Sequence, residues 1–166
     1  MTDNDFPALV ASIAETNRYF QQQAQKQVNV ALTLRNWLIG AYLFEYEQNG
    51  RDRAVYGEGL YKRLAAQLQA SGVAGASRSN LHLFRQFYLG YPEIVQTVSG
   101  QLQSGDETAR AILDRVSSKT ATVHMGSIVQ SPSGQLTVSP GVLINQLSFS
   151  HIIELLKADS PLKRAF

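Results

Sequence analysis

Side chains that donate hydrogen bonds recur at helical spacing within the segment SRSNLHLFRQFYLGY. At about 100° per residue, Arg78, His82, Arg85 and Gln86 fall on one side of a helix. Arg pairs with the acceptors of guanine and Gln with those of adenine, so such a side is typical of a helix that lies in a DNA major groove. The residues that we predict to contact DNA are Arg78, Ser79, His82, Arg85 and Gln86. The alternatives are an exposed polar face or a subunit interface.

Four further cations are candidates for contacts with the DNA backbone. Lys62 and Arg63 belong to the preceding helical stretch, and Arg51 and Arg53 follow the end of a helix. Arg and Lys neutralise phosphate oxygens and fix the orientation of a protein on the duplex. For Arg51 and Arg53 the alternative is a solvated turn with local ion pairs to neighbouring carboxylates, which contribute little when exposed.

The residues that could support catalysis lack the required spacing. His82, His124 and His151 lie far apart in sequence, and no glycine-rich phosphate loop or nucleophile elbow is present. His151 has Glu154 three residues on, a spacing more typical of a cap or a surface contact than of a metal ligand. Glu154 and Lys157 suit a surface ion pair. We therefore predict no cofactor, no metal and no small-molecule substrate.

A pair of helices must position the predicted DNA contacts. The first helix carries an apolar stripe at Leu60, Leu64 and Leu68, and Ser77 is suited to cap the second helix. The side chains of the second helix that we expect to pack inward are Leu81, Phe84 and Tyr88. The connection at 71–76 is longer than the roughly 3–4 residues of a tight helix-turn-helix. This length favours a looser, winged-helix-like arrangement.

The first 49 residues form the expected scaffold. Apolar residues recur at helical spacing from Phe6, and Pro7 and Gly40 are the only helix-disfavouring residues before Asn49. We predict one very long helix, or two in tandem with a break at 27–29. Asn49 and the glycine after it predict the helix end.

The second half of the chain is more polar. We expect a helical domain at 1–98, a polar insert at 99–146 and a C-terminal helical segment at 147–166. The insert predicts a short helix capped by Asp106, and a β-hairpin near 121–139 that would act as a wing. The alternative to the hairpin is a surface loop. The chain is therefore expected to be mostly α-helical.

Composition limits the class of protein. The 166 residues are 44% hydrophobic, contain no cysteine and carry a net charge of +2, so a phosphate-binding surface must come from local clustering of charge. No apolar run is long enough to span a bilayer, and the acidic, polar start MTDNDFPALV differs from a secretory signal. We expect a cytoplasmic protein without membrane contact.

Several sequence segments resemble the N-terminal domain of YhcG-type bacterial proteins, a family of nucleases of the PD-(D/E)XK kind. The carrying segments, together about half of the chain, are VNVALTLRNWLIGAYLFEYEQNGRDRAVYG, YKRLAAQL, SRSNLHLFRQFYLGYPEIVQT and LSFSHIIELLKADSPLKRAF. The resemblance does not extend to 99–146. It implies a helical, winged-helix-like module for DNA binding or assembly, followed by a nuclease domain.

Nuclease chemistry of that kind needs an Asp at a strand end and a Glu-x-Lys on the next strand to hold Mg²⁺ and the attacking water. We find no such pair in the sequence. We therefore expect a non-catalytic DNA-binding and assembly module whose nuclease domain is absent from this chain. The alternative is a dimerisation or protein-interaction module without DNA contact, in which the helix from Phe6 to Asn49 packs against its copy as a homodimer.

Overall fold

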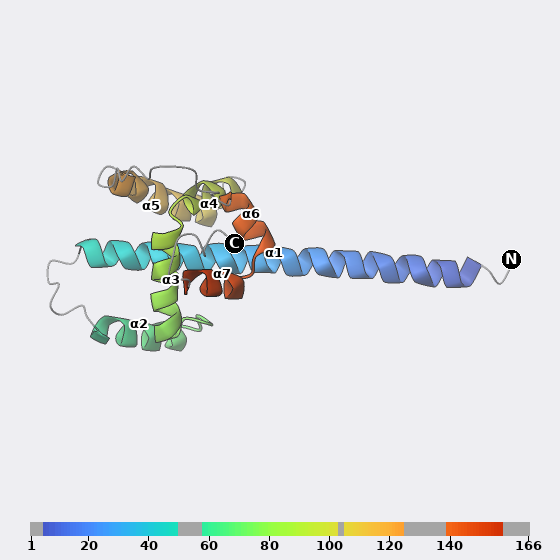
Figure 1. The fold of residues 1–166 in the computed structure, drawn as a ribbon, viewed down its shortest axis with the longest axis horizontal. Helices are drawn as coiled ribbons and strands as arrows, with labels where there is room; N and C mark the ends of the chain where they lie inside the picture. The colour runs from blue at the N-terminus through green and yellow to red at the C-terminus, as the bar shows by residue number, and fades with distance from the viewer. Residues whose placement is uncertain (1–4, 50–57, 103–104, 125–138, 158–166) are drawn as a thin grey trace.

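A computed structural model describes residues 5–49, 58–102, 105–124 and 139–157 (Figure 1). Within these ranges the chain forms helices and no strand, which confirms the prediction of a mostly α-helical protein. None of the described helices is long and apolar enough to cross a membrane. The helices are α1 (Asp5–Asn49), α2 (Glu58–Ala70), α3 (Arg78–Gly90), α4 (Ile94–Leu102), α5 (Glu107–His124), α6 (Pro140–Gln146) and α7 (Phe149–Leu156).

Helix α1 is a single 45-residue helix, so the first of the two alternatives for this region is the observed one. No break occurs at 27–29, where helix-compatible Gln, Val and Asn continue the hydrogen-bonding pattern. Its N-terminal half projects away from the other helices (Figure 1), and every residue at 6–28 is exposed. At about 1.5 Å per residue, this bare segment is about 35 Å long.

The C-terminal half of α1 is the central element of the core. Val30, Leu34 and Trp37 follow helical spacing and are buried, with Trp37 completely inaccessible to solvent. The indole Nε1 of Trp37 donates a hydrogen bond to the carbonyl oxygen of Tyr91 (2.9 Å). This bond satisfies a buried polar atom and ties α1 to the end of α3.

Helix α3 crosses α1 at very close range (Figure 1). A Cβ atom added to Gly40 would lie 2.0 Å from the carbonyl oxygen of Phe84. Only a glycine in α1 permits this approach of the α3 backbone. The crossing therefore depends on the one glycine that interrupts the sequence of α1.

Helices α2 and α3 form the expected helix-turn-helix pair. The hydroxyl oxygen of Ser77 accepts a hydrogen bond from the backbone nitrogen of Asn80 (3.2 Å), which confirms the predicted N-cap. Gly72 and Gly75 have φ values of 78° and 76°, a left-handed backbone conformation that glycine adopts without strain. These two glycines allow the long connection. The apolar sides of the pair join a second core cluster of Leu43, Leu60, Tyr61, Ala76, Leu81 and Phe84.

The remaining helices enclose a first core cluster, in which Trp37 packs with Phe87, Ile94 and Ile152. Helices α4 and α5 pack on each other and α6 packs on α1 and α4, while α7 packs on α3 and α1. The ring of Phe149 lies 5.3 Å from that of Phe84 and 5.7 Å from that of Phe87, between centroids. The predicted C-terminal helical segment is thus observed at 149–156, and 158–166 lie outside the described residues.

The expected β-hairpin near 121–139 is wrong over its first residues. Residues 121–124 are the last turn of α5 rather than part of a strand. No glycine or proline interrupts the sequence between Asp106 and Met125, and the β-branched residues in this stretch carry only a small helix penalty. The helix therefore continues through them. Residues 125–138, including the proposed turn, lie outside the described part of the chain.

Candidate nucleic-acid interface

Helix α3 separates its apolar and polar side chains as the sequence predicts, with one exception. The residues buried against α1, α2 and α7 are Leu81, Phe84, Phe87 and Tyr88. The predicted DNA contacts that are exposed are Arg78, Ser79, His82 and Gln86. Arg78, His82 and Gln86 are spaced four residues apart, so they form one row along the outer side of α3. Arg85 is the exception.

Arg85 is half-buried and engaged in a contact within the protein. Its Nε donates to Oε2 of Glu47, near the end of α1. Its guanidinium carbon also lies 5.9 Å from the centre of the Phe44 ring, within the range of a cation–π contact. The structure thus places Arg85 beside the predicted row, where it fastens α3 to α1.

Glu47 links three helices. Its Oε1 accepts a hydrogen bond from the hydroxyl of Tyr61 in α2 (2.6 Å), while its other oxygen accepts from Arg85 in α3. Burial, then the hydrogen bond to Glu47 and its negative charge, raise the pKa of Tyr61 well above its ordinary value of 10.0. Tyr61 therefore remains a neutral donor at physiological pH.

Tyr61 also supports a predicted DNA contact. Its ring stacks on the imidazole of His82, with centroids 3.9 Å apart and planes inclined by 11°. This contact covers one face of the imidazole, while the residue as a whole remains exposed. The stack holds the outer row of α3 at a defined position relative to α2.

The cations of α2 complete the surface that the structure describes. Lys62 and Arg63 follow Tyr61 directly and are exposed. Arg51 and Arg53, which are the other two predicted phosphate contacts, lie outside the described residues. The structure therefore brings six of the nine predicted residues to the exposed surface of the α2–α3 pair. Arg85 lies beside this surface, half-buried against Glu47 of α1.

The α2–α3 pair has a charge bias that motif searching misses. These two helices contain Lys62, Arg63, Arg78 and Arg85 against a single carboxylate, Glu58 at the start of α2, whereas the whole chain carries only +2. The positive excess of the chain is thus concentrated in this pair of helices. A sliding count of charge along the sequence would have revealed it.

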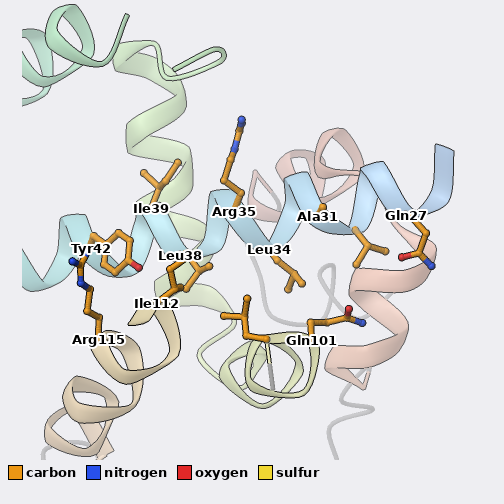
Figure 2. A pocket seen from close by; sticks show the side chains of 12 residues that line it. Gln27, Ala31, Leu34, Arg35, Leu38, Ile39, Tyr42, Gln101, Ile112 and Arg115 are labelled. Carbon is orange, nitrogen blue, oxygen red and sulfur yellow. The ribbon is translucent and has the colours of Figure 1, made fainter. Parts of the chain in front are cut away.

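A groove of about 470 Å³ opens between α1, α4 and α5 (Figure 2). Leu34, Leu38 and Ile112 extend into it, and Arg115 is directed toward Tyr42 at one end. Its lining is largely aliphatic. The polar side chains in its lining are those of Gln27, Arg35, Tyr42, Gln101 and Arg115.

Among the described residues, no group of three His, Asp or Glu side chains could hold a metal ion. The Nδ1 of His151 accepts from the backbone nitrogen of Ser148 (3.3 Å) in a capping box at the start of α7. Glu154 pairs with Lys157 (2.8 Å between Oε1 and Nζ) on an exposed surface. His151 thus takes part in a cap with Ser148 rather than in a pair with Glu154, and Glu154 and Lys157 form the surface ion pair that their spacing indicates.

Comparisons with known proteins identify the family of the chain. The model of the family described as "DUF1016 N-terminal domain" matches residues 12–124, which is more than half of the chain. The chain is also similar to a protein of Escherichia coli (strain K12) named "Putative nuclease YhcG", with 42% identity over 79 residues. That match covers 46% of this chain and 21% of the relative, so most of the relative has no counterpart here. No solved structure matches. The chain belongs to the DUF1016 N-terminal domain family.

Proposed function

We propose that this chain is a non-catalytic DNA-binding and assembly module of a YhcG-like nuclease. The observation that carries the DNA-binding part is the exposed, donor-rich surface of α2 and α3, two helices with four cations and one carboxylate, Glu58. Clustered positive charge with hydrogen-bond donors is the expected footprint of a nucleic-acid-binding surface. In this proposal the protein acts in the cytoplasm.

The row on α3 has dimensions suited to a DNA groove. From Arg78 to Gln86 the row extends about 12 Å along the helix axis, and a major groove about 12 Å wide admits an α-helix. Arg78 is the first residue of α3, where the positive end of the helix dipole also attracts phosphate. In this proposal His82, Gln86 and Ser79 contact base edges or the adjacent backbone.

The cations of α2 and Arg85 have different roles in this proposal. Lys62 and Arg63 are exposed and provide phosphate contacts that do not depend on base sequence. Arg85 maintains the angle between α3 and α1 through Glu47. Its removal is therefore expected to alter folding as well as binding.

The test is binding of a fluorescent DNA duplex at low salt, measured by anisotropy. Wild type should bind, and Arg78→Ala and the double variant Lys62→Ala/Arg63→Ala should each bind at least about tenfold more weakly, because each removes a charge-assisted contact. Arg110→Ala is the matched control, since Arg110 is exposed on α5, on the opposite side of α1 from α2 (Figure 1). Absence of binding by wild type, or equal losses in all variants, would contradict the proposal.

The second candidate function is a dimerisation or protein-interaction module without DNA contact. The observation that favours it is the projecting half of α1, whose large apolar side chains are exposed. Contiguous exposed apolar surface marks interaction sites. A chain that self-associates and does not bind duplex DNA at low salt would establish this alternative.

A further inference from the structure

An apolar stripe runs along the projecting half of α1. Its exposed members are Phe6 (70%), Leu9 (55%), Val10 (50%), Ile13 (60%), Phe20 (64%) and Val28 (52%). Helical spacing places them on one side of α1, and they belong to neither cluster of the core. We call these six residues the N-terminal stripe.

The N-terminal stripe is too apolar to be an ordinary solvent-facing surface of a helix. Helices in proteins gain most of their stability from packing an apolar side, yet residues 6–28 of α1 are all exposed. Six exposed side chains of this kind offer roughly 100 Å² each, or about 600 Å² per chain. Two such surfaces joined would bury about 1,200 Å², which reaches the range of stable protein interfaces.

We infer that the N-terminal stripes of two copies of this chain pack against each other as an antiparallel helix pair. A second copy presents the same stripe, and a two-fold axis makes one surface complementary to itself. The charged side chains of this segment, Glu15, Arg18 and Lys26, fall on the opposite side of the helix. Identical chains therefore bury no like charges when the stripes meet.

The distribution of side-chain size favours the antiparallel direction. The first half of the stripe holds Phe6, Leu9, Val10 and Ile13 on successive turns, whereas the second half holds Phe20 and Val28 with the smaller Ala24 between them. An antiparallel pair places large residues opposite small ones and keeps the axes at a uniform distance. It also puts the two cores at opposite ends of the pair, because the core of each chain lies at the far end of α1 (Figure 1).

The antiparallel pair rests on the assembly part of the proposed function and requires no contact with DNA. The first measurement is molar mass in solution by light scattering across micromolar concentrations. Wild type should have the mass of a dimer, and Ile13→Glu should be a monomer because it introduces a charge into the stripe. Ala11→Glu should remain a dimer, since Ala11 is exposed on the opposite side of the same helix.

The emission of Trp37, the single tryptophan, reports whether the core is folded in each variant. It should be unchanged by Ile13→Glu. A wild-type chain that is monomeric at all concentrations would overturn the inference. The stripe would then be a candidate binding surface for a different protein. A dimeric Ile13→Glu with native Trp37 emission would also overturn it.

Disulfide cross-linking tests the direction, because the chain contains no native cysteine. In an antiparallel pair centred near Asn17, the two copies of Ala24 lie about 20 Å apart, too far for a disulfide. Asn17→Cys should therefore form a covalent dimer under oxidising conditions, and Ala24→Cys should not. Equal cross-linking of both variants would overturn the antiparallel arrangement.

Parallel measurements of DNA binding separate this inference from the proposed function. If wild type is a monomer that binds duplex DNA, the helix pair alone is wrong. If wild type is a dimer through the stripe and does not bind DNA, the inference stands and the DNA-binding part of the proposed function fails.

Discussion

The backbone of Phe84 in α3 lies directly against Gly40 in α1. A Cβ at Gly40 would come within 2.0 Å of the Phe84 carbonyl oxygen and 2.6 Å of its carbonyl carbon. Since backbone atoms form the contact, no change of side-chain rotamer relieves such a clash. The position of the DNA-contacting helix we propose is thus tied to a single glycine.

Gly40→Ala should lower the free energy of unfolding by about 2–3 kcal/mol or more, because the α1–α3 crossing must open to admit the methyl group. Denaturant unfolding followed by Trp37 fluorescence measures the change. Gly59→Ala is the matched control: no atom lies within 4 Å of its added Cβ, and alanine favours the helix by up to about 1 kcal/mol. Similar stability of the two variants would refute the close crossing.

Thr33 is a buried polar residue whose replacement should be tolerated. It is completely inaccessible, and its hydroxyl has no hydrogen-bond partner among the described residues. Thr33→Val should therefore leave the free energy of unfolding unchanged or raise it by about 1 kcal/mol. Thr16→Val, in the exposed half of α1, provides the control and should change it by less than about 0.5 kcal/mol. A clear loss of stability in Thr33→Val alone would show that the hydroxyl is bonded.

Glu47 should contribute to stability through its two partners. Glu47→Gln keeps the shape of the side chain but removes the negative charge of the carboxylate, to which Tyr61 and Arg85 donate hydrogen bonds. We expect a loss of about 1–2 kcal/mol, in line with hydrogen bonds to a partly exposed carboxylate. Gln48→Ala, at the exposed neighbouring position, should have little effect in the same denaturant titration. Equal stability of Glu47→Gln and wild type would show that the three-helix link is dispensable.

Tyr61 should make stability depend on alkaline pH. Its pKa is raised in the folded protein, so the unfolded chain ionises first as pH rises past 10.0. The stabilising contribution is fully present below that pH and is lost above it. From about pH 9 to about pH 11, the free energy of unfolding should fall more steeply in wild type than in Tyr61→Phe. Tyr19→Phe, at an exposed position, should follow the wild-type curve. Parallel curves for Tyr61→Phe and wild type would contradict the raised pKa.

Local sequence signals were sufficient to predict the helices that carry the candidate interface. Apolar spacing and the capping hydroxyl of Ser77 act within a few residues, so they place α3 and its exposed side. Arg85 lies on that side by spacing alone. Its partner Glu47 is 38 residues away in sequence, and only the fold brings the two together.

Other features depended on tertiary packing or on weak propensities. Periodicity predicted an apolar side for α1, but tertiary packing decides that the other helices cover this side from Val30 onward and leave 6–28 exposed. The β-branched run at 121–124 suggested a strand, yet an uninterrupted preceding helix continues through it. DNA contact by Arg51 and Arg53 stays a prediction.

The central claim, that the exposed surface of α2 and α3 binds DNA, is tested most directly by the salt dependence of duplex binding. With Arg78, Lys62 and Arg63 as phosphate contacts, the logarithm of the binding constant should fall with the logarithm of salt concentration with a slope of about −3. The double variant Lys62→Ala/Arg63→Ala should reduce the slope to about −1. An identical slope in the double variant, or no binding by wild type at low salt, would contradict the account.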